Sequence, residues 1–273
     1  QNCGFCGLGC NISIRSSLGN ISYVTHPDIY GFNKKNICFY GKFGWEVTAE
    51  EKRVTEPMLK TSRGWEKIDW RRASAILKDR MSRAKNRYFS ISPHNSNEEI
   101  LLMQEIAKNQ ELPLSSLTYR KIFTDDIFSQ YRNNLTFDDL AKAEHLVIIG
   151  EVTQTLRVIC RSEQRKGKKL TLINDKNNKF NRYADFLYQN EDLSKIIECM
   201  ANELNNKEKC LQSLLKNQTN EQLKITPKTI FIYNRNRISE KVIYDIWHLA
   251  HQVCDFEEGS GVLETSDWMN VNG

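Results

Sequence analysis

The chain has 273 residues and a formal net charge of +5, which is enough sequence for one large domain or two smaller ones. Hydrophobic residues make up 40% of the chain and charged residues 27%, an ordinary balance for a globular protein. No stretch approaches the ~20 apolar residues of a membrane span, and no signal peptide precedes the first cysteine. We therefore predict a cytoplasmic protein without a membrane span. The start at Gln1 and the end at Gly273 predict that the natural chain extends further at both ends.

Four of the eight cysteines lie within the first 38 residues. Cys3, Cys6 and Cys10 share one glycine-rich stretch, and Cys38 completes the spacing C-x2-C-x3-C-x27-C. Three thiolates on one loop and a fourth at a distance are typical of the ligands of a [4Fe–4S] cluster. The intervening glycines favour this interpretation, because nearby backbone N–H groups can donate to the cluster's sulfurs. Structural zinc is the alternative, although zinc sites usually combine two close cysteine pairs.

Residues 11–24 alternate apolar and polar side chains around Gly19 and Asn20, which predicts a β-hairpin. This hairpin would carry the chain away from Cys10 and return it to Cys38. The aromatic side chains of Phe5, Phe39 and Tyr40 are expected to shield the cluster from water. We predict a small cluster-binding domain over residues 1–60.

Strands and helices alternate after a helix that Asp69 is expected to cap, which runs to about residue 85. This alternation is typical of parallel βαβ units, so we predict a Rossmann-like parallel α/β sheet over residues 61–273. Residues 112–135 are expected to be irregular or weakly helical. The predicted strands cover 88–92, 146–150, 169–175 and 229–233, and the predicted helices cover 97–109, 153–166, 192–205, 207–216 and 239–253.

The other four cysteines are scattered singly, and a disulfide framework is typical of short secreted domains rather than of such a chain. We expect Cys160, Cys199, Cys210 and Cys254 to be buried apolar thiols. His248 and His251 are three residues apart on one predicted helix, but no carboxylate pair completes a metal site, so they are expected to be ordinary helix-face residues. The locally basic N-terminal third is expected to be a solvated face rather than a nucleic-acid site.

The cysteine spacing, the hairpin and the segments that begin at Cys38, Arg53 and Trp65 together resemble the start of the molybdopterin oxidoreductase family. That family includes formate dehydrogenases, periplasmic nitrate reductases and the large iron–sulfur subunit of respiratory complex I. The resemblance continues in the apolar strand that ends at Gly150 and in the glycine-rich segment from Gly259. It implies a [4Fe–4S] domain followed by an α/β domain of the kind that binds a pterin dinucleotide.

Several positions depart from the family's pattern. Tyr40 occupies the position where family enzymes usually place a lysine between cluster and pterin. Residues 112–135 contain neither Cys nor His, where catalytic members carry a cysteine, selenocysteine or serine ligand of the metal. Glu151 follows the strand that ends at Gly150 and is expected to repel a pyrophosphate. Together these departures predict that molybdopterin is absent.

We therefore predict an electron-transfer subunit that has one [4Fe–4S] cluster and is not itself catalytic. Its expected partners are other redox subunits, iron–sulfur or flavoproteins, in a hetero-oligomer that contains no nucleic acid. One alternative is the N-terminal part of a catalytic molybdenum or tungsten oxidoreductase with two pterin guanine dinucleotides. The second alternative is a zinc-binding module that interacts with nucleic acid.

Overall fold

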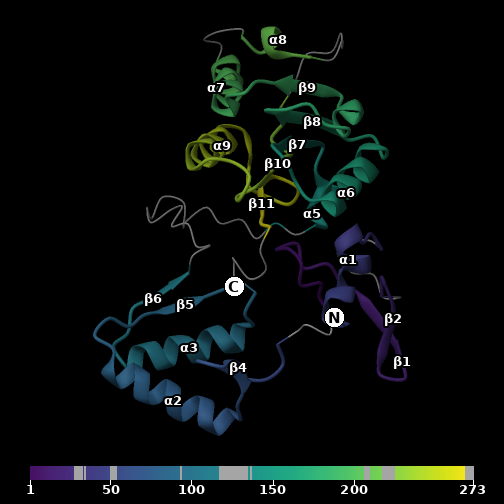
Figure 1. Ribbon diagram of the computed structural model, residues 1–273. Coiled ribbons are helices and arrows are strands. Elements are labelled where there is room, and N and C mark those ends of the chain that lie inside the picture. Colours follow the sequence, from purple (N-terminus) through teal and green to yellow (C-terminus); the bar gives the residue numbers. More distant parts are fainter. Residues whose placement is uncertain are drawn as a thin grey trace. The chain divides into compact units, whose positions relative to one another are not determined.

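The computed structural model of the chain describes residues 1–27, 33, 35–49, 54–92, 94–116, 135, 137–205, 210–216 and 225–267 (Figure 1). These residues belong to two compact units. The first unit consists of Gln1–Lys42 and Lys121–Met269, and the second of Phe43–Arg120 and Asn270–Gly273. These two compact units do not coincide with the predicted domains, residues 1–60 and 61–273. The predicted domain boundary near residue 60 stays a prediction. The predicted irregular segment 112–135 lies mostly outside the described residues.

The first unit is built on a parallel β-sheet of five strands with the order β11-β10-β7-β8-β9. All four strand pairings within this sheet are parallel. The predicted Rossmann-like α/β class is therefore confirmed, although β9 and β11 were not predicted. The strands are β7 (His145–Ile149), β8 (Lys169–Asn174), β9 (Phe186–Gln189), β10 (Thr229–Asn234) and β11 (Gly261–Thr265).

Helices cover both faces of this sheet, with α6 on one side and α7 and α9 on the other (Figure 1). Every residue of β7 and β10 is buried, as expected for central strands that are covered on both faces. The helices are α5 (Asp139–Lys142), α6 (Gln154–Gln164), α7 (Leu193–Leu204), α8 (Leu211–Leu214) and α9 (Glu240–Val253), with a short 3-10 turn η2 (Asn181–Tyr183).

The ends of the helices follow from local side-chain chemistry. The Ser239 hydroxyl accepts a hydrogen bond from the backbone N–H of Val242 at the start of α9, as the sequence predicted. The Asp192 carboxylate caps α7 in the same way, through the N–H of Ser194 at 3.0 Å. Gly167 follows α6 with φ +102°, the left-handed backbone that commonly ends a helix.

The N-terminal segment of the first unit forms the predicted hairpin from β1 (Ser13–Ser17) and β2 (Asn20–Thr25). Its turn lies at Leu18 and Gly19, whose φ values are 50° and 82°, one residue earlier than predicted. A short helix, α1 (Phe39–Phe43), begins directly after Cys38 and continues as the 3-10 helix η1 (Gly44–Ala49).

The second unit contains the antiparallel pair β3 (Met58–Thr61) and β4 (Gly64–Lys67) and the parallel pair β5 (Phe89–Ile91) and β6 (Leu114–Ser116). Its helices are α2 (Trp70–Arg83) and α3 (Asn97–Asn109). Asp69 caps α2 as predicted, because its carboxylate accepts from the Arg72 N–H at 2.8 Å. In the described part of the whole chain, no helix is long and apolar enough to cross a bilayer.

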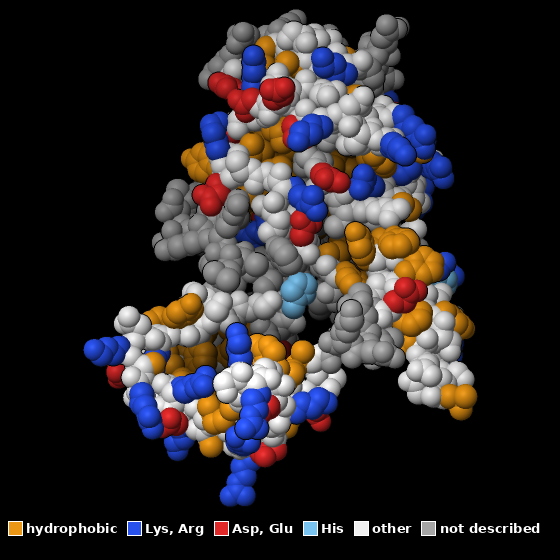
Figure 2. All heavy atoms as spheres, viewed as in Figure 1, with side chains coloured by type: hydrophobic (Ala, Val, Ile, Leu, Met, Phe, Trp, Pro, Cys, Tyr) orange, Lys and Arg blue, Asp and Glu red, His pale blue; other side chains and the backbone are white. Residues whose placement is uncertain are grey.

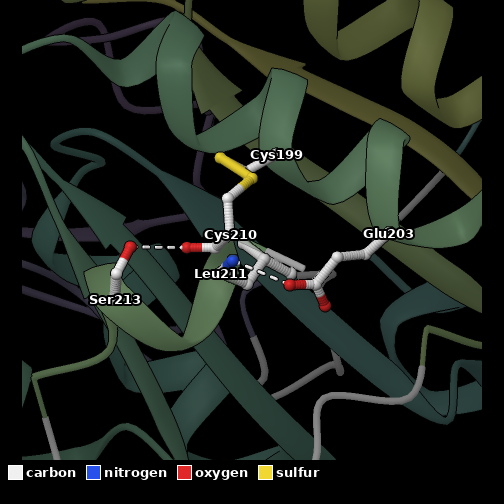
Figure 3. The surroundings of a disulfide bond; sticks show 5 residues. All are labelled: Cys199, Glu203, Cys210, Leu211 and Ser213. Carbon is white, nitrogen blue, oxygen red and sulfur yellow. Dashed lines mark hydrogen bonds between the residues drawn. A yellow bond between two sulfur atoms is a disulfide. The ribbon is translucent and has the colours of Figure 1, made fainter. Parts of the chain in front are cut away.

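Two of the scattered cysteines do not remain thiols. Cys199 in the middle of α7 and Cys210 directly before α8 form a disulfide bond, with Cα atoms 5.6 Å apart (Figure 3). The expectation of four buried thiols is therefore wrong for this pair. Eleven residues separate the two cysteines in the sequence, but the packing of α8 against α7 brings them together. Cys160 is a free thiol with no exposed surface, as expected, whereas Cys254 is a free thiol that is only partly buried.

Gly259 lies in the turn before β11 and allows this turn to approach the end of α5. A Cβ atom there would lie 2.7 Å from the carbonyl carbon of Lys142. Gly19 has the same φ of +82° but nothing within 4 Å of its Cβ position.

Gly19→Ala is expected to cost about 1 kcal/mol of unfolding free energy from backbone strain alone. Gly259→Ala should cost about 1–3 kcal/mol more, because it also crowds fixed backbone atoms. Urea denaturation of both variants measures this difference, and equal losses would contradict it.

Candidate iron–sulfur centre and adjoining cleft

The four predicted ligand cysteines all carry free thiols in the first unit. Cys3 and Cys10 are buried, whereas Cys6 and Cys38 are partly exposed. A Cβ atom on Gly41 in α1 would lie 3.5 Å from the Cys3 sulfur, and the Gly41 N–H donates to the Cys38 sulfur at 3.5 Å. The start of α1 therefore brings Cys38 back toward the N-terminal loop.

Backbone hydrogen bonds fold the N-terminal loop back on itself and onto the sheet. The N–H of Cys3 donates to the carbonyl of Cys10 at 2.7 Å, and the N–H of Gly9 donates to the carbonyl of Cys6 at 3.2 Å. The N–H of Gly7 donates to the carbonyl of Ser266 at 3.0 Å, directly after β11. Leu8, Cys3 and Cys10 belong to the same hydrophobic core as α6 and one face of the sheet. The α/β fold therefore positions the cysteine loop at the carboxyl ends of its strands.

Burial raises the pKa of Cys3, Cys6 and Cys10 and so favours their protonated form. The pKa of Cys10 is raised to about 12, mainly by burial and then by the negative charges that Cys6 and Cys3 would carry, while a hydrogen bond with Thr155 opposes the rise. Burial also raises the pKa values of Cys3 and Cys6, and charge on Cys38 adds to both effects. Such thiols become thiolates when bound iron stabilises the negative charge.

Asn33 holds the returning segment against the cysteine loop, a role that the sequence analysis did not identify. Its side chain is only 1% exposed. Its Oδ1 accepts from the Asn11 N–H at 3.2 Å, and its Nδ2 donates to the carbonyl oxygens of Asn11 and Asn36. These bonds join Asn33 and Asn36 to Asn11, directly after Cys10. The role of Asn33 becomes visible only from its hydrogen bonds to Asn11, which is 22 residues away in the sequence. A single asparagine outside any motif does not predict such bonds.

Removing this amide tests its structural role. Asn33→Ala is expected to lower the unfolding free energy by about 1–3 kcal/mol, because partly buried backbone groups of residues 11 and 36 lose their partner. Chemical denaturation measures the change, with Asn20→Ala on the exposed hairpin as the control. A loss no larger than that of the control would show that Asn33 does not hold the segment.

A cleft of about 1010 Å³ lies beside the cysteines. Cys6, Cys38, Phe5 and Tyr40 line it on one side. The opposite side is formed by the turn after β7, by α6 and by the segment around η2. Six basic side chains line the cleft: Arg157, Arg161, Arg165, Lys179, Arg182 and Arg237. Figure 2 shows Lys and Arg side chains gathered on this side of the first unit, over α6.

The two carboxylates in the cleft are already paired with arginines. Glu151 lies 3.4 Å from Arg237 and 3.9 Å from Arg157. Asp267 contacts Arg237 at 2.6 Å, and this hydrogen bond is the main cause that raises the pKa of Arg237. The expectation that Glu151 repels a pyrophosphate therefore loses its physical basis, because its charge is offset by two guanidinium groups. The cleft as a whole favours anions.

The three aromatic side chains predicted near the cysteines lie together at the surface. The ring centroids of Phe5 and Tyr40 are 6.2 Å apart, and those of Phe39 and Tyr40 are 5.9 Å apart. Phe5 is 42% exposed, whereas Phe39 and Tyr40 are 63% and 64% exposed. Their role as a shield stays a prediction.

The histidines of α9 pack against aromatic rings, as expected for helix-face residues. His248 lies edge-on to Tyr244, with centroids 4.2 Å apart, and His251 stacks on Phe256 at 4.7 Å. Among the described residues, no group of three or more His, Cys, Asp or Glu side chains is arranged to hold a metal ion. The residues searched include Cys3, Cys6, Cys10 and Cys38, so their role as cluster ligands stays a prediction.

Comparison with known proteins identifies the class to which this fold and its cleft belong. The family model described as Molybdopterin oxidoreductase matches residues 53–255, which is most of the chain. The chain therefore belongs to the molybdopterin oxidoreductase family, as the sequence resemblance suggested. The four candidate ligand cysteines precede the matched stretch.

Related proteins agree with this assignment. "Putative formate dehydrogenase SH0748" of Staphylococcus haemolyticus is 24% identical over 181 residues, which cover 62% of this chain and 18% of that protein. "Probable oxidoreductase YjgC" of Bacillus subtilis is 24% identical over 183 residues, with the same coverage. The chain thus spans less than a fifth of the length of these relatives. In fold, the chain is similar to acetylene hydratase from Pelobacter acetylenicus, with a TM-score of 0.58 and 14% identity over 76% of this chain and 32% of that chain.

Proposed function

We propose that the chain holds one [4Fe–4S] cluster on Cys3, Cys6, Cys10 and Cys38 and transfers single electrons within a larger oxidoreductase complex. The observation that supports this proposal most directly is the set of four free thiols, three on one loop and one directly before α1. The Gly41 N–H that donates to Cys38 is the kind of contact that stabilises cluster-bound sulfur. When bound, the cluster would supply one-electron redox chemistry.

The protein's own residues would hold, insulate and orient the cluster. Cys3 and Cys10 would bind its buried side, where Leu8 and the sheet exclude water. Cys6 and Cys38 would bind the side that faces the cleft. The N–H of Gly7 on Ser266 and the Asn33 amide would keep the ligand loop in place. Phe5, Phe39 and Tyr40 would limit solvent access on the outer side.

We further propose that this segment has no molybdenum site of its own and acts with other redox subunits. Tyr40 replaces the lysine that the family resemblance leads one to expect, and residues 112–135 contain no Cys or His. A second candidate function is the N-terminal part of a catalytic enzyme that binds a pterin dinucleotide. The specific observation that favours this second candidate is the large cleft lined by basic side chains next to Cys6 and Cys38.

Metal and cofactor analysis of anaerobically purified protein tests these proposals. We expect about four irons per chain, an EPR signal after reduction, and neither molybdenum, tungsten nor pterin. Stoichiometric pterin with molybdenum or tungsten would replace the first candidate with the second. Zinc without iron would refute the cluster.

A further inference from the structure

The second unit has an open hollow of about 740 Å³. Its lining is mainly apolar: Val54, Pro57, Met58, Trp65 and Trp70. The one charged group in the lining is the Glu56 carboxylate, which the Lys67 ammonium contacts at 2.8 Å. The hollow therefore offers a partner an apolar contact, and its single charge is already paired.

The pairing of β3 with β4 sets which side chains share one face of this hairpin. Lys60 is opposite Trp65, and Met58 is opposite Lys67, so these four side chains stand on the same face. The Lys60 ammonium lies 6.0 Å from the centroid of the Trp65 ring. Trp65 is 64% exposed, and Trp70, the first residue of α2, is 72% exposed. Both tryptophans therefore leave most of their surface in contact with water.

The second unit buries very little apolar surface of its own. Among its described residues, Ala107 is the only hydrophobic residue that is buried. None of the 14 residues of α2 is buried. Contiguous apolar surface that a soluble protein leaves exposed usually marks a binding site. We therefore expect another molecule to cover the hollow.

The hairpin and α2 have a strong excess of positive charge. Residues 60–87 contain ten Lys or Arg and three Asp or Glu, and all ten basic side chains are exposed. Figure 2 shows Lys and Arg side chains next to hydrophobic ones on this unit. Four basic residues adjoin the tryptophans in the sequence or in the strand pairing and have no carboxylate partner among the described residues: Lys60, Arg63, Arg71 and Arg72. We call these four residues the basic border.

Shape and charge together favour one kind of occupant. A second copy of the chain would place the same positive charge against the basic border, and like charges oppose such a contact. A bilayer surface is flat, whereas an inserted side chain can fill a hollow. Nucleic acid would match the charge, but it would leave the aliphatic side chains of Val54 and Met58 without an apolar partner.

We propose that the hollow binds an acidic polypeptide segment of another protein. One apolar side chain of this segment inserts against Trp65 and Trp70, and its carboxylates contact the basic border. A buried apolar anchor within a charged border is the usual composition of a protein interface. This inference goes beyond the proposed function and does not require a bound cluster.

Selection from a random peptide library displayed on phage tests the chemistry of the partner. The full chain serves as bait, and W65A/W70A, which changes two exposed side chains, serves as the comparison bait. Peptides retained by the wild type but not by W65A/W70A should have acidic residues on both sides of an apolar one. Retention of no such peptides, or of basic or neutral sequences, would refute the proposal.

The affinity of the most enriched peptide tests the two halves of the surface separately. Fluorescence anisotropy should show that W65F/W70F retains most of the affinity that W65A/W70A loses, because phenylalanine keeps an aromatic contact. R63E/R71E/R72E is expected to weaken binding at least about tenfold at low salt and much less at high salt. The matched control is K195E/K216E/K228E, which reverses three exposed charges of the first unit and should change the affinity less than about twofold.

Other occupants would give different results. Binding to phosphatidylglycerol vesicles or to oligothymidine that is lost in W65A/W70A would overturn the proposal in favour of a membrane or nucleic acid. A dimer in sedimentation that W65A/W70A dissociates would assign the hollow to a second copy. Equal losses of peptide affinity in the two triple variants would refute the basic border, because net charge would then explain the effect. None of these measurements depends on iron, so they are independent of the proposed cluster.

Discussion

Cys38→Ser is expected to abolish the iron–sulfur absorbance and the EPR signal of the reduced protein, with iron falling from about four per chain to near zero. Cys38 is the most informative of the four ligands to replace. It is partly exposed at the start of α1, so its loss leaves the core of the sheet intact. Cys3 and Cys10 belong to that core, and their replacement would mix loss of iron with loss of packing.

A matched control comes from a cysteine far from the loop. The Cys254 thiol donates to the Thr229 carbonyl at 3.3 Å, and a serine hydroxyl can make the same hydrogen bond. Cys254→Ser should therefore keep its full iron content. Circular dichroism should show native helix content in both variants. If folded Cys38→Ser protein retained a complete cluster, the assignment of the fourth ligand would be wrong.

The elements that the sequence predicted well are those with a strong local signal. The apolar strands β7, β8 and β10 are largely buried, and β7 and β10 are each followed by a helix whose end or beginning is marked by a nearby residue, Gly167 or Ser239. The hairpin β1–β2 was predicted for the same reason, from alternation around Gly19.

The features that were missed depend on contacts between distant parts of the chain. β11 contains Gly261 and follows Gly259, so it resembles a loop until its pairing with β10 is known. The long-range partner of Asn33 is Asn11, 22 residues earlier. Glu151 was judged by its charge alone, whereas Arg237, which offsets that charge, lies 86 residues further along the chain. Spacing could therefore suggest the cysteine ligands, but not the surface that surrounds them.

The edge of the sheet depends on the disulfide between Cys199 and Cys210. The segment that follows Cys210 contains α8 and pairs with the edge strand β9 through an isolated bridge between Leu215 and Tyr188. The N–H of Lys216 also donates to the Leu187 carbonyl at 2.8 Å. Besides the disulfide, Glu203 of α7 accepts from the Leu211 N–H at 2.7 Å (Figure 3). The segment thus covers backbone groups that an exposed edge strand would offer to other chains.

Removal of the disulfide is expected to destabilise the protein and to release this segment first. Closing a loop of this length stabilises a fold by about 3 kcal/mol in the chain-entropy model. C199S/C210S should therefore unfold at a lower urea concentration, with a Tm lower by about 6–12 °C. Hydrogen exchange should accelerate at the N–H of Lys216, whose bond holds the segment to β9, before it accelerates at β7 or β10 in the centre of the sheet.

A reductant distinguishes the covalent bond from the side chains themselves. Dithiothreitol should lower the unfolding free energy of the wild-type protein to about that of C199S/C210S and leave the double variant unchanged. Cys254→Ser, which keeps the disulfide, should respond to dithiothreitol like the wild type. If reductant left the wild-type stability and the exchange of Lys216 unaltered, hydrogen bonds and the burial of Leu211, which is only 4% exposed, would be sufficient to hold the segment against β9.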